Sequence, residues 1–198
     1  MHVKLSNYVA DFMAKNGIKH VFTVTGGGAM HLNDSLGHHP EIQCVYNHHE
    51  QASAIAAEGY TRLSGELAAV CVTSGPGGTN AITGVLGGWL DSIPMFIISG
   101  QVKRETTVWS TEIPLRQLGD QEYAIVESVR SMTKYAKMIT EPMEIRYHLE
   151  KALYLCKNGR GGPVWLDIPL DVQASMIDVE ELQGFDENEM PKGHWSSI

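Results

Sequence analysis

The sequence predicts an α/β fold: a doubly wound, mostly parallel β-sheet with helices on both faces. Short apolar runs rich in valine and isoleucine alternate with helical stretches along the first 170 residues, and this alternation is typical of parallel sheets. Glycine-rich corners at residues 25–28 and 73–80 each stand between an apolar run and a helix. With 198 residues, of which 43% are hydrophobic, the chain is long enough for one domain and an extension.

An opening helix is expected to begin with Ser6 as its N-cap and to end near Asn16. Gly17 then suits the left-handed turn that often ends a helix. The other expected helices cover residues 29–36, 50–64, 81–89, 122–130 and 141–157. The expected strands cover residues 18–24, 42–46, 67–72, 94–99, 135–139 and 164–168, the last of these being the final strand.

Two segments lack a clear period. Residues 100–120 are expected to form a long loop, and loops of this length in compact domains are often functional. Beyond residue 173 the chain becomes acidic, with six acids and one base between residues 176 and 198. We therefore expect a domain at residues 1–173, and residues 174–198 are either an interdomain linker or a frayed tail.

Composition excludes several classes of function. The net charge of −8 makes nucleic acid and anionic membranes unexpected partners. Cys44, Cys71 and Cys156 are scattered without zinc-ligand spacing, so we expect reduced thiols and no metal site. No apolar run reaches the length of a membrane span, and the first residues lack a signal-peptide core. These features predict a cytoplasmic protein.

Glu50 stands where the strand at residues 42–46 gives way to the helix at residues 50–64. A helix N-terminus favours a carboxylate, and open α/β folds bind ligands at the carboxyl ends of their strands. Two readings stay open at this point. Glu50 either complements the helix dipole alone or addresses a ligand.

The corners at residues 25–28, 47–50 and 74–80 should meet at one edge of the sheet. A dinucleotide fingerprint would need glycine at His31, and neither glycine corner carries a Walker lysine. The adjacent His48 and His49 make a poor metal chelate, so they are interpreted as a polar corner and active-site wall. The arrangement suits a flat heteroaromatic group held against backbone, with a carboxyl addressing one ring nitrogen.

Several motifs resemble the N-terminal, pyrimidine-binding domain of thiamine-diphosphate-dependent enzymes of the acetohydroxyacid (acetolactate) synthase type. The motifs occur in the family's order over about residues 3–173, and they are more specific for the domain than for its substrate. They are His20-Val21-Phe22 through Gly26-Gly27, His49-Glu50-Gln51-Ala52, Thr73-Ser74-Gly75-Pro76-Gly77-Gly78-Thr79-Asn80, Asp91-Ser92-Ile93-Pro94-Met95, Gly100-Gln101-Val102, Gln121-Glu122 and Gly162-Pro163-Val164-Trp165-Leu166-Asp167-Ile168-Pro169.

This resemblance implies that Glu50 is the catalytic glutamate facing N1′ of the cofactor's aminopyrimidine. A carboxyl at that nitrogen promotes the proton transfer that prepares the cofactor to attack a 2-oxo acid. The residues implied near the pyrimidine are Thr25, Gly26, Glu50, Gly75 and Asn80. Gln121 is implied on the substrate side, and His49 is placed there as a wall residue.

The sequence also departs from the family. Thr25 replaces the proline usual in acetohydroxyacid synthases, and residues 103–119 differ, so substrate or flavin contacts carried there cannot be transferred and FAD dependence stays open. The family holds the diphosphate and Mg²⁺ with a G-D-G motif in a separate domain, whereas the nearest match here is Gly119-Asp120-Gln121. We therefore expect a diphosphate-binding domain of a second chain as partner, in a homodimer or higher homo-oligomer. The chain would be either a fragment or the pyrimidine subunit of a split enzyme, inactive alone in both cases.

The expected function is acetolactate synthase-like carboligation of 2-oxo acids. A 2-oxo acid decarboxylase is the alternative within enzymes, because both activities share this module. A non-catalytic assembly or regulatory domain is the alternative from another class, but scaffolding does not need the carboxylate of Glu50.

Overall fold

A computed structural model describes residues 1–190 of the chain. Its main sheet has six strands, all parallel, in the order β3-β2-β4-β5-β7-β6. The strands are β2 (His20–Thr23), β3 (Gln43–Tyr46), β4 (Ala69–Val72), β5 (Met95–Gln101), β6 (Tyr135–Met138) and β7 (Pro163–Pro169). The predicted α/β class with a parallel sheet is confirmed.

The strand order places a switch point in the middle of the sheet. From β2 the chain moves to one side to form β3 and then crosses to the other side of β2 to form β4. The loops after β2 and β4 therefore leave the sheet in opposite directions. Open α/β sheets bind ligands in the crevice that such a divergence creates.

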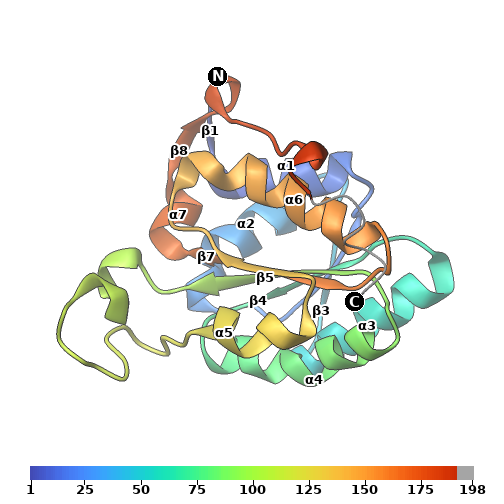
Figure 1. The fold of residues 1–198 in the computed structure, drawn as a ribbon, viewed down its shortest axis with the longest axis horizontal. Helices are drawn as coiled ribbons and strands as arrows, with labels where there is room; N and C mark the ends of the chain where they lie inside the picture. The colour runs from blue at the N-terminus through green and yellow to red at the C-terminus, as the bar shows by residue number, and fades with distance from the viewer. Residues whose placement is uncertain (191–198) are drawn as a thin grey trace.

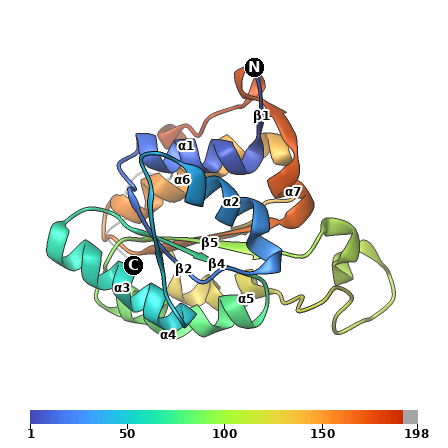
Figure 2. The ribbon, with the colours of Figure 1, turned by 180° about the vertical axis from the view of Figure 1, so that it is seen from behind.

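Helices cover both faces of the sheet, as predicted. In Figure 1, α1, α2, α6 and α7 lie above the strands and α3, α4 and α5 lie below them, and Figure 2 shows the same layers from behind. The helices are α1 (Leu5–Lys15), α2 (Met30–His38), α3 (Glu50–Ser64), α4 (Pro76–Leu90), α5 (Ile125–Val129), α6 (Ile145–Lys157) and α7 (Leu170–Ala174).

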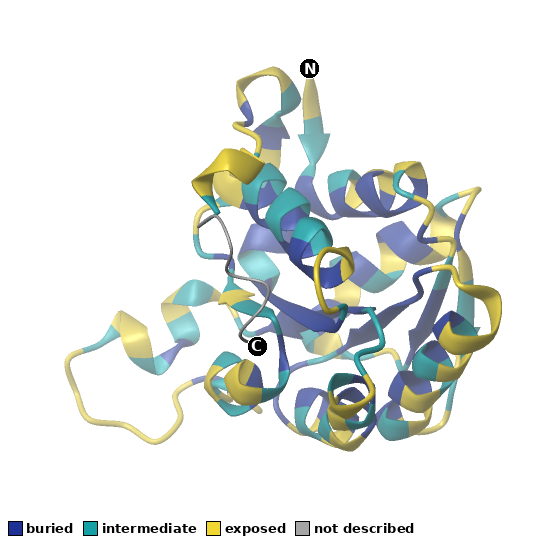
Figure 3. Cartoon of the chain, turned by 45° about the vertical axis from the view of Figure 1, so that its right-hand side comes forward, coloured by how far each residue is buried: buried dark blue, intermediate teal, exposed yellow. Residues whose placement is uncertain are grey.

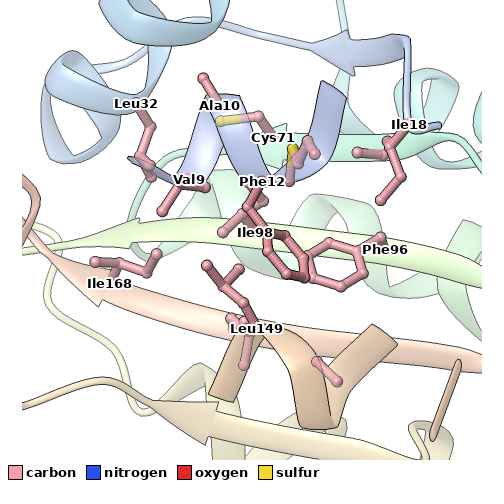
Figure 4. Packing of buried hydrophobic residues seen from close by; sticks show 14 of the residues in the cluster. Val9, Ala10, Phe12, Ile18, Leu32, Cys71, Phe96, Ile98, Leu149 and Ile168 are labelled. Carbon is pink, nitrogen blue, oxygen red and sulfur yellow. The ribbon is translucent and has the colours of Figure 1, made fainter. Parts of the chain in front are cut away.

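Each layer has its own hydrophobic core. Figure 4 shows Phe96 and Ile98 of β5 between Phe12 of α1 and Leu149 of α6. On the other face, Trp165 is fully buried with the small residues of α3 and α4. The central strands appear buried from end to end in Figure 3. Truncating a buried aromatic such as Phe96 to alanine would cost about 3–5 kcal/mol.

The strand predicted at residues 164–168 is not the last strand of the chain, in contrast to the prediction. A further strand, β8 (Met176–Asp178), pairs antiparallel with β1 (His2–Lys4) as a separate two-stranded sheet. Ile177 and Leu182 are buried in the core on the side of the sheet that α1, α2 and α6 cover. Two isolated apolar residues give no period, so the packing of this segment against the core could not be predicted from a sequence pattern. The predicted boundary at residue 173 stays a prediction, and residues 191–198 of the expected linker or tail lie outside the described residues.

Ser6 is not the N-cap of the first helix. The cap position is Lys4, which makes no side-chain cap bond, and Ser6 is buried inside α1. Its hydroxyl oxygen instead accepts a hydrogen bond from Ser35 of α2 over 2.8 Å. The expected Gly17 turn is confirmed, with φ of +79°.

The helix predicted at residues 122–130 is shorter, because α5 begins only at Ile125. The carbonyl of Tyr123 accepts a hydrogen bond from the Gln101 side chain, and the Glu122 carboxylate is engaged by loop amides. Because Glu122 and Tyr123 make these contacts with β5 and the loop, the first predicted turn is not helical. The loop before it extends away from the body (Figure 1) and contains two 3₁₀ turns, at Arg104–Thr106 and Val108–Ser110.

Within residues 1–190, no helix combines the length and the apolar character needed to cross a membrane.

Candidate functional site

The three predicted corners lie at the carboxyl ends of β2, β3 and β4, which are neighbours around the switch point. Parallel pairing brings these ends to one edge of the sheet. Gly28 of the first corner donates its backbone N–H to Oγ1 of Thr73 in the third corner over 3.0 Å. The first and third corners therefore touch.

Glu50 is the first residue of α3 and is 9% exposed. The side-chain amide of Asn80, from α4, donates a hydrogen bond to Oε2 of Glu50 over 3.0 Å. The other oxygen, Oε1, makes no hydrogen bond with the described part of the chain. A nearly buried carboxylate is thus held by one oxygen and has the second available as an acceptor.

Thr73 contacts glycines of two corners. The sequence placed it in a motif but predicted no role for it. A Cβ on Gly26 would lie 2.5 Å from Thr73 Cβ, and one on Gly28 would lie 3.1 Å from Thr73 Oγ1. A Cβ on Gly77 would lie 2.6 Å from Thr73 Cγ2 and 3.6 Å from Glu50 Oε1. Three glycines therefore close around one threonine side chain beside Glu50. The signal was a polar residue directly after a buried strand.

Gly75 and Gln121 are also brought together. Gly75 is the N-cap of α4 and has φ of +54°, a conformation that glycine adopts without strain. A Cβ on this residue would collide with the backbone carbonyl oxygen of Gln121. Gln121 itself has φ of +56° and is exposed. The turn containing Gln121 thus packs against the N-terminus of α4, the helix that carries Asn80.

Two predicted residues are not joined to this cluster. Thr25 is exposed, and no hydrogen bond or ion pair within residues 1–190 links its side chain to Glu50. His49 is exposed and caps α3, with its Nδ1 accepting a hydrogen bond from the Gln51 backbone over 3.1 Å. The capping role is a structural function for this ring, and the substrate-side placement of His49 stays a prediction.

A second buried acid lies deeper in the sheet. Asp167 of β7 accepts hydrogen bonds from Ser99 over 2.6 Å and from Gln101 over 3.0 Å. Burial raises the pKa of Asp167 to about 7, although the hydrogen bonds from Ser99 and Gln101 oppose the rise. Asp167 also borders a cavity of about 270 Å³ whose lining includes Trp109 and Lys137. The sequence indicated Asp167 only as part of a motif.

The residues present suit a flat nitrogen heterocycle. Glu50 supplies an acceptor, Asn80 binds one of its two carboxylate oxygens, and the glycine corners bring backbone without side chains around Thr73 beside it. The described residues contain no group of three or more His, Cys, Asp and Glu side chains placed to hold a metal ion.

Comparison with known proteins agrees with this geometry. Residues 3–125 match the family model of the thiamine pyrophosphate enzyme N-terminal TPP binding domain. The chain is 35% identical over 176 residues to the chloroplastic acetolactate synthase of Arabidopsis thaliana, covering 87% of this chain and 25% of that protein. It is 36% identical over 176 residues to chloroplastic acetolactate synthase 1 of Oryza sativa subsp. japonica, covering 87% and 26%.

The chain thus spans about a quarter of the length of these relatives. The match begins at β1, and it includes β2, β3, β4 and all three corners of the candidate site. The sequence motifs, the parallel sheet and the family match agree: the chain belongs to the family of N-terminal TPP binding domains of thiamine pyrophosphate enzymes.

Proposed function

We propose that the chain supplies the aminopyrimidine-binding half of an enzyme that joins 2-oxo acids, as acetolactate synthases do. The contact of Glu50 with Asn80 at the switch point carries this proposal. A nearly buried carboxylate with one oxygen left without a hydrogen bond in residues 1–190 is not needed for folding. It is suited to a ring nitrogen that must gain and lose a proton.

When bound, thiamine diphosphate supplies the carbon nucleophile and the electron sink for bonds beside the carbonyl of a 2-oxo acid. The chain's own residues bind and orient it. Glu50 holds a proton between its carboxyl and the ring nitrogen, and Asn80 keeps that carboxyl in one rotamer. Gly26 and Gly75 let the backbone approach the ring, with Thr25 at the rim. Gln121 and His49 face the substrate side.

The charged end of the cofactor requires a partner in this proposal. Diphosphate and Mg²⁺ would be held by a diphosphate-binding domain of a second chain, within a homodimer or higher homo-oligomer. Exposed apolar side chains on α3 and α4 support such an interface: Ile55, Leu86 and Leu90. A reducing, cytoplasmic location is consistent with the unpaired thiols of Cys44, Cys71 and Cys156.

A 2-oxo acid decarboxylase is the second candidate, because the same carboxylate serves both reactions. The two differ in whether a second 2-oxo acid or a proton captures the product of decarboxylation. The identity of 35% to an acetolactate synthase favours carboligation. No feature among residues 1–190 favours FAD, so it is not included in the proposal.

The decisive experiment combines the chain with a diphosphate-binding half, thiamine diphosphate, Mg²⁺ and pyruvate. Acetolactate is the expected product, and acetaldehyde would instead indicate the decarboxylase. Glu50→Gln should nearly abolish turnover, whereas Glu41→Gln, the same change at an exposed site, should not alter it. Normal turnover by the Glu50 variant would refute the assignment, and failure to bind cofactor even with the partner half would favour an assembly domain.

A further inference from the structure

Glu122 holds the loop at residues 102–121 by an unusual set of contacts. Glu122 is 9% exposed, and its carboxylate accepts three backbone N–H groups. Oε1 accepts from Val108 over 2.6 Å, and Oε2 accepts from Leu118 over 2.8 Å and from Gly119 over 3.2 Å. Hydrogen bonds to an ionised acceptor are roughly twice as strong as neutral ones. One side chain therefore ties two segments of the outer loop together, at Val108 and at Leu118–Gly119.

The three Glu122 contacts, called the clamp below, lie next to a strained turn. Gln121, the residue before Glu122, has φ of +56°, which is uncommon for a residue other than glycine. Its backbone carbonyl fills the space that a side chain at Gly75 would need. Strain of this kind persists only where the surroundings fix it. The Glu122 contacts provide that constraint on one side of the turn.

Gln101 provides the constraint on the other side. Its side chain is fully buried, and Nε2 donates to the Tyr123 carbonyl over 2.8 Å and to Asp167 over 3.0 Å. Its Oε1 accepts the Val102 backbone N–H over 3.0 Å. The turn at Gln121 is thus held between Glu122 contacts to the loop and a Gln101 contact to the sheet.

The turn contacts Gly75, which connects it to the candidate site. Gly75 begins α4, and Asn80 on that helix holds Glu50. We propose that Glu122 is a positioning residue, which fixes the Gln121 turn against Gly75 and thereby forms the substrate-facing wall beside Glu50. This inference rests on the proposed function for the identity of the substrate. The clamp itself is a property of this chain.

Hydrogen exchange on the full chain tests the clamp directly. In Glu122→Gln, a side-chain amide group faces at least one backbone N–H in place of an acceptor, so exchange should rise about tenfold or more at one or more of Val108, Leu118 and Gly119. In Glu122→Ala all three amides should lose protection. Glu105→Gln is the matched control, because this exposed carboxylate of the same loop lies 3.8 Å from Lys103 and accepts no loop amide.

Steady-state kinetics of the chain assembled with its diphosphate-binding half test the role of the wall. Glu122→Gln should raise KM for pyruvate about tenfold while the half-saturating concentration of thiamine diphosphate stays within about twofold. Unchanged loop exchange, an unchanged KM, or a general loss of protection across β4 and β5 would each overturn the proposal. Absence of turnover in the unmutated assembly would contradict the proposed function instead, and exchange would still decide the clamp.

Discussion

The side-chain amide of Asn80 donates a hydrogen bond to Oε2 of Glu50 over 3.0 Å, joining the first residue of α3 to the fifth residue of α4, two helices that follow different strands. The contact spans 30 residues of sequence and crosses the switch point of the sheet. It leaves Oε1 of Glu50 available. The relationship explains why a helix-start carboxylate becomes a defined acceptor at the switch point of the sheet.

Asn80→Ala should reduce turnover of the assembled enzyme by about 10- to 100-fold, because a hydrogen bond to a charged group is worth about 1.5–3 kcal/mol. Asn80→Asp should be worse, since it places a second carboxylate against Glu50. Thr79→Ala is a suitable control, because among the described residues Thr79 hydrogen-bonds only within its own turn. Equal kcat for Asn80→Ala and the unmutated enzyme would show that the contact does not serve the reaction.

Gly77→Ala should destabilise the fold and weaken cofactor binding, because its Cβ would lie 2.6 Å from Thr73 Cγ2. Gly27→Ala is the matched control for stability, since nothing in residues 1–190 lies within 4 Å of a Cβ there. Thr73→Ser removes the clashing methyl and should partly restore Gly77→Ala. The same serine should not restore Gly26→Ala, because the Cβ of that alanine would lie 2.5 Å from Thr73 Cβ as well as from Cγ2, and serine keeps the Cβ. Thermal unfolding of the single and double variants measures both couplings.

Asp167→Asn should change how stability depends on pH. The folded state holds a proton on Asp167 up to about pH 7, whereas the unfolded chain releases it near the ordinary value of 3.8. Folded Asp167 therefore binds the proton more tightly, so its contribution to stability falls as pH rises from about 4 to about 7 and is constant above that. Relative to the unmutated protein, the Asn variant should gain up to about 1.4 kcal/mol per pH unit across this window.

Asp171→Asn provides the contrasting control for that measurement. Partial burial opposes ionisation of Asp171, but hydrogen bonds from the Arg104 backbone and guanidinium outweigh it and lower the pKa. Its stabilising contribution is present above about pH 4 and is lost only as pH falls further. The difference between this variant and the unmutated protein should stay flat from pH 5 to 8. Parallel curves for both variants would contradict the assignment of the buried proton to Asp167.

Gly59→Ala should stabilise the domain by about 0.5–1 kcal/mol. Gly59 lies in the middle of α3, and a Cβ on it would meet nothing within 4 Å. Alanine lowers the entropy of the unfolded chain without a steric cost. Gly84→Ala, in the middle of α4, should have the opposite effect, because its Cβ would lie 2.6 Å from Ala54 Cβ. Denaturant midpoints of the two variants should move in opposite directions.

Local signals predicted much of the fold. Helix α3 was expected at residues 50–64 and has those bounds, since an apolar strand, a polar corner and Gly65 mark its ends. Gly65 has φ of +74°, as a helix-ending glycine requires. The six strands of the main sheet were placed to within about two residues, because each is a short run rich in apolar residues. Strands β1 and β8 were not predicted. Gly75 and Asn80 were found through a glycine corner that follows a strand, and Glu50 through a polar corner between a strand and a helix.

The remaining features depend on contacts between distant segments. Residues 20–80 of the sequence by themselves determined a carboxylate and two glycine corners at the ends of parallel strands, because those patterns are local. Only the tertiary structure decided that Asn80 holds Glu50, that Thr73 is enclosed by glycines from two corners, and that Glu122 clamps a loop. The pairing of β8 with β1 also joins the two ends of the described chain. Such contacts leave no period in the sequence, because each depends on the path of the backbone through space.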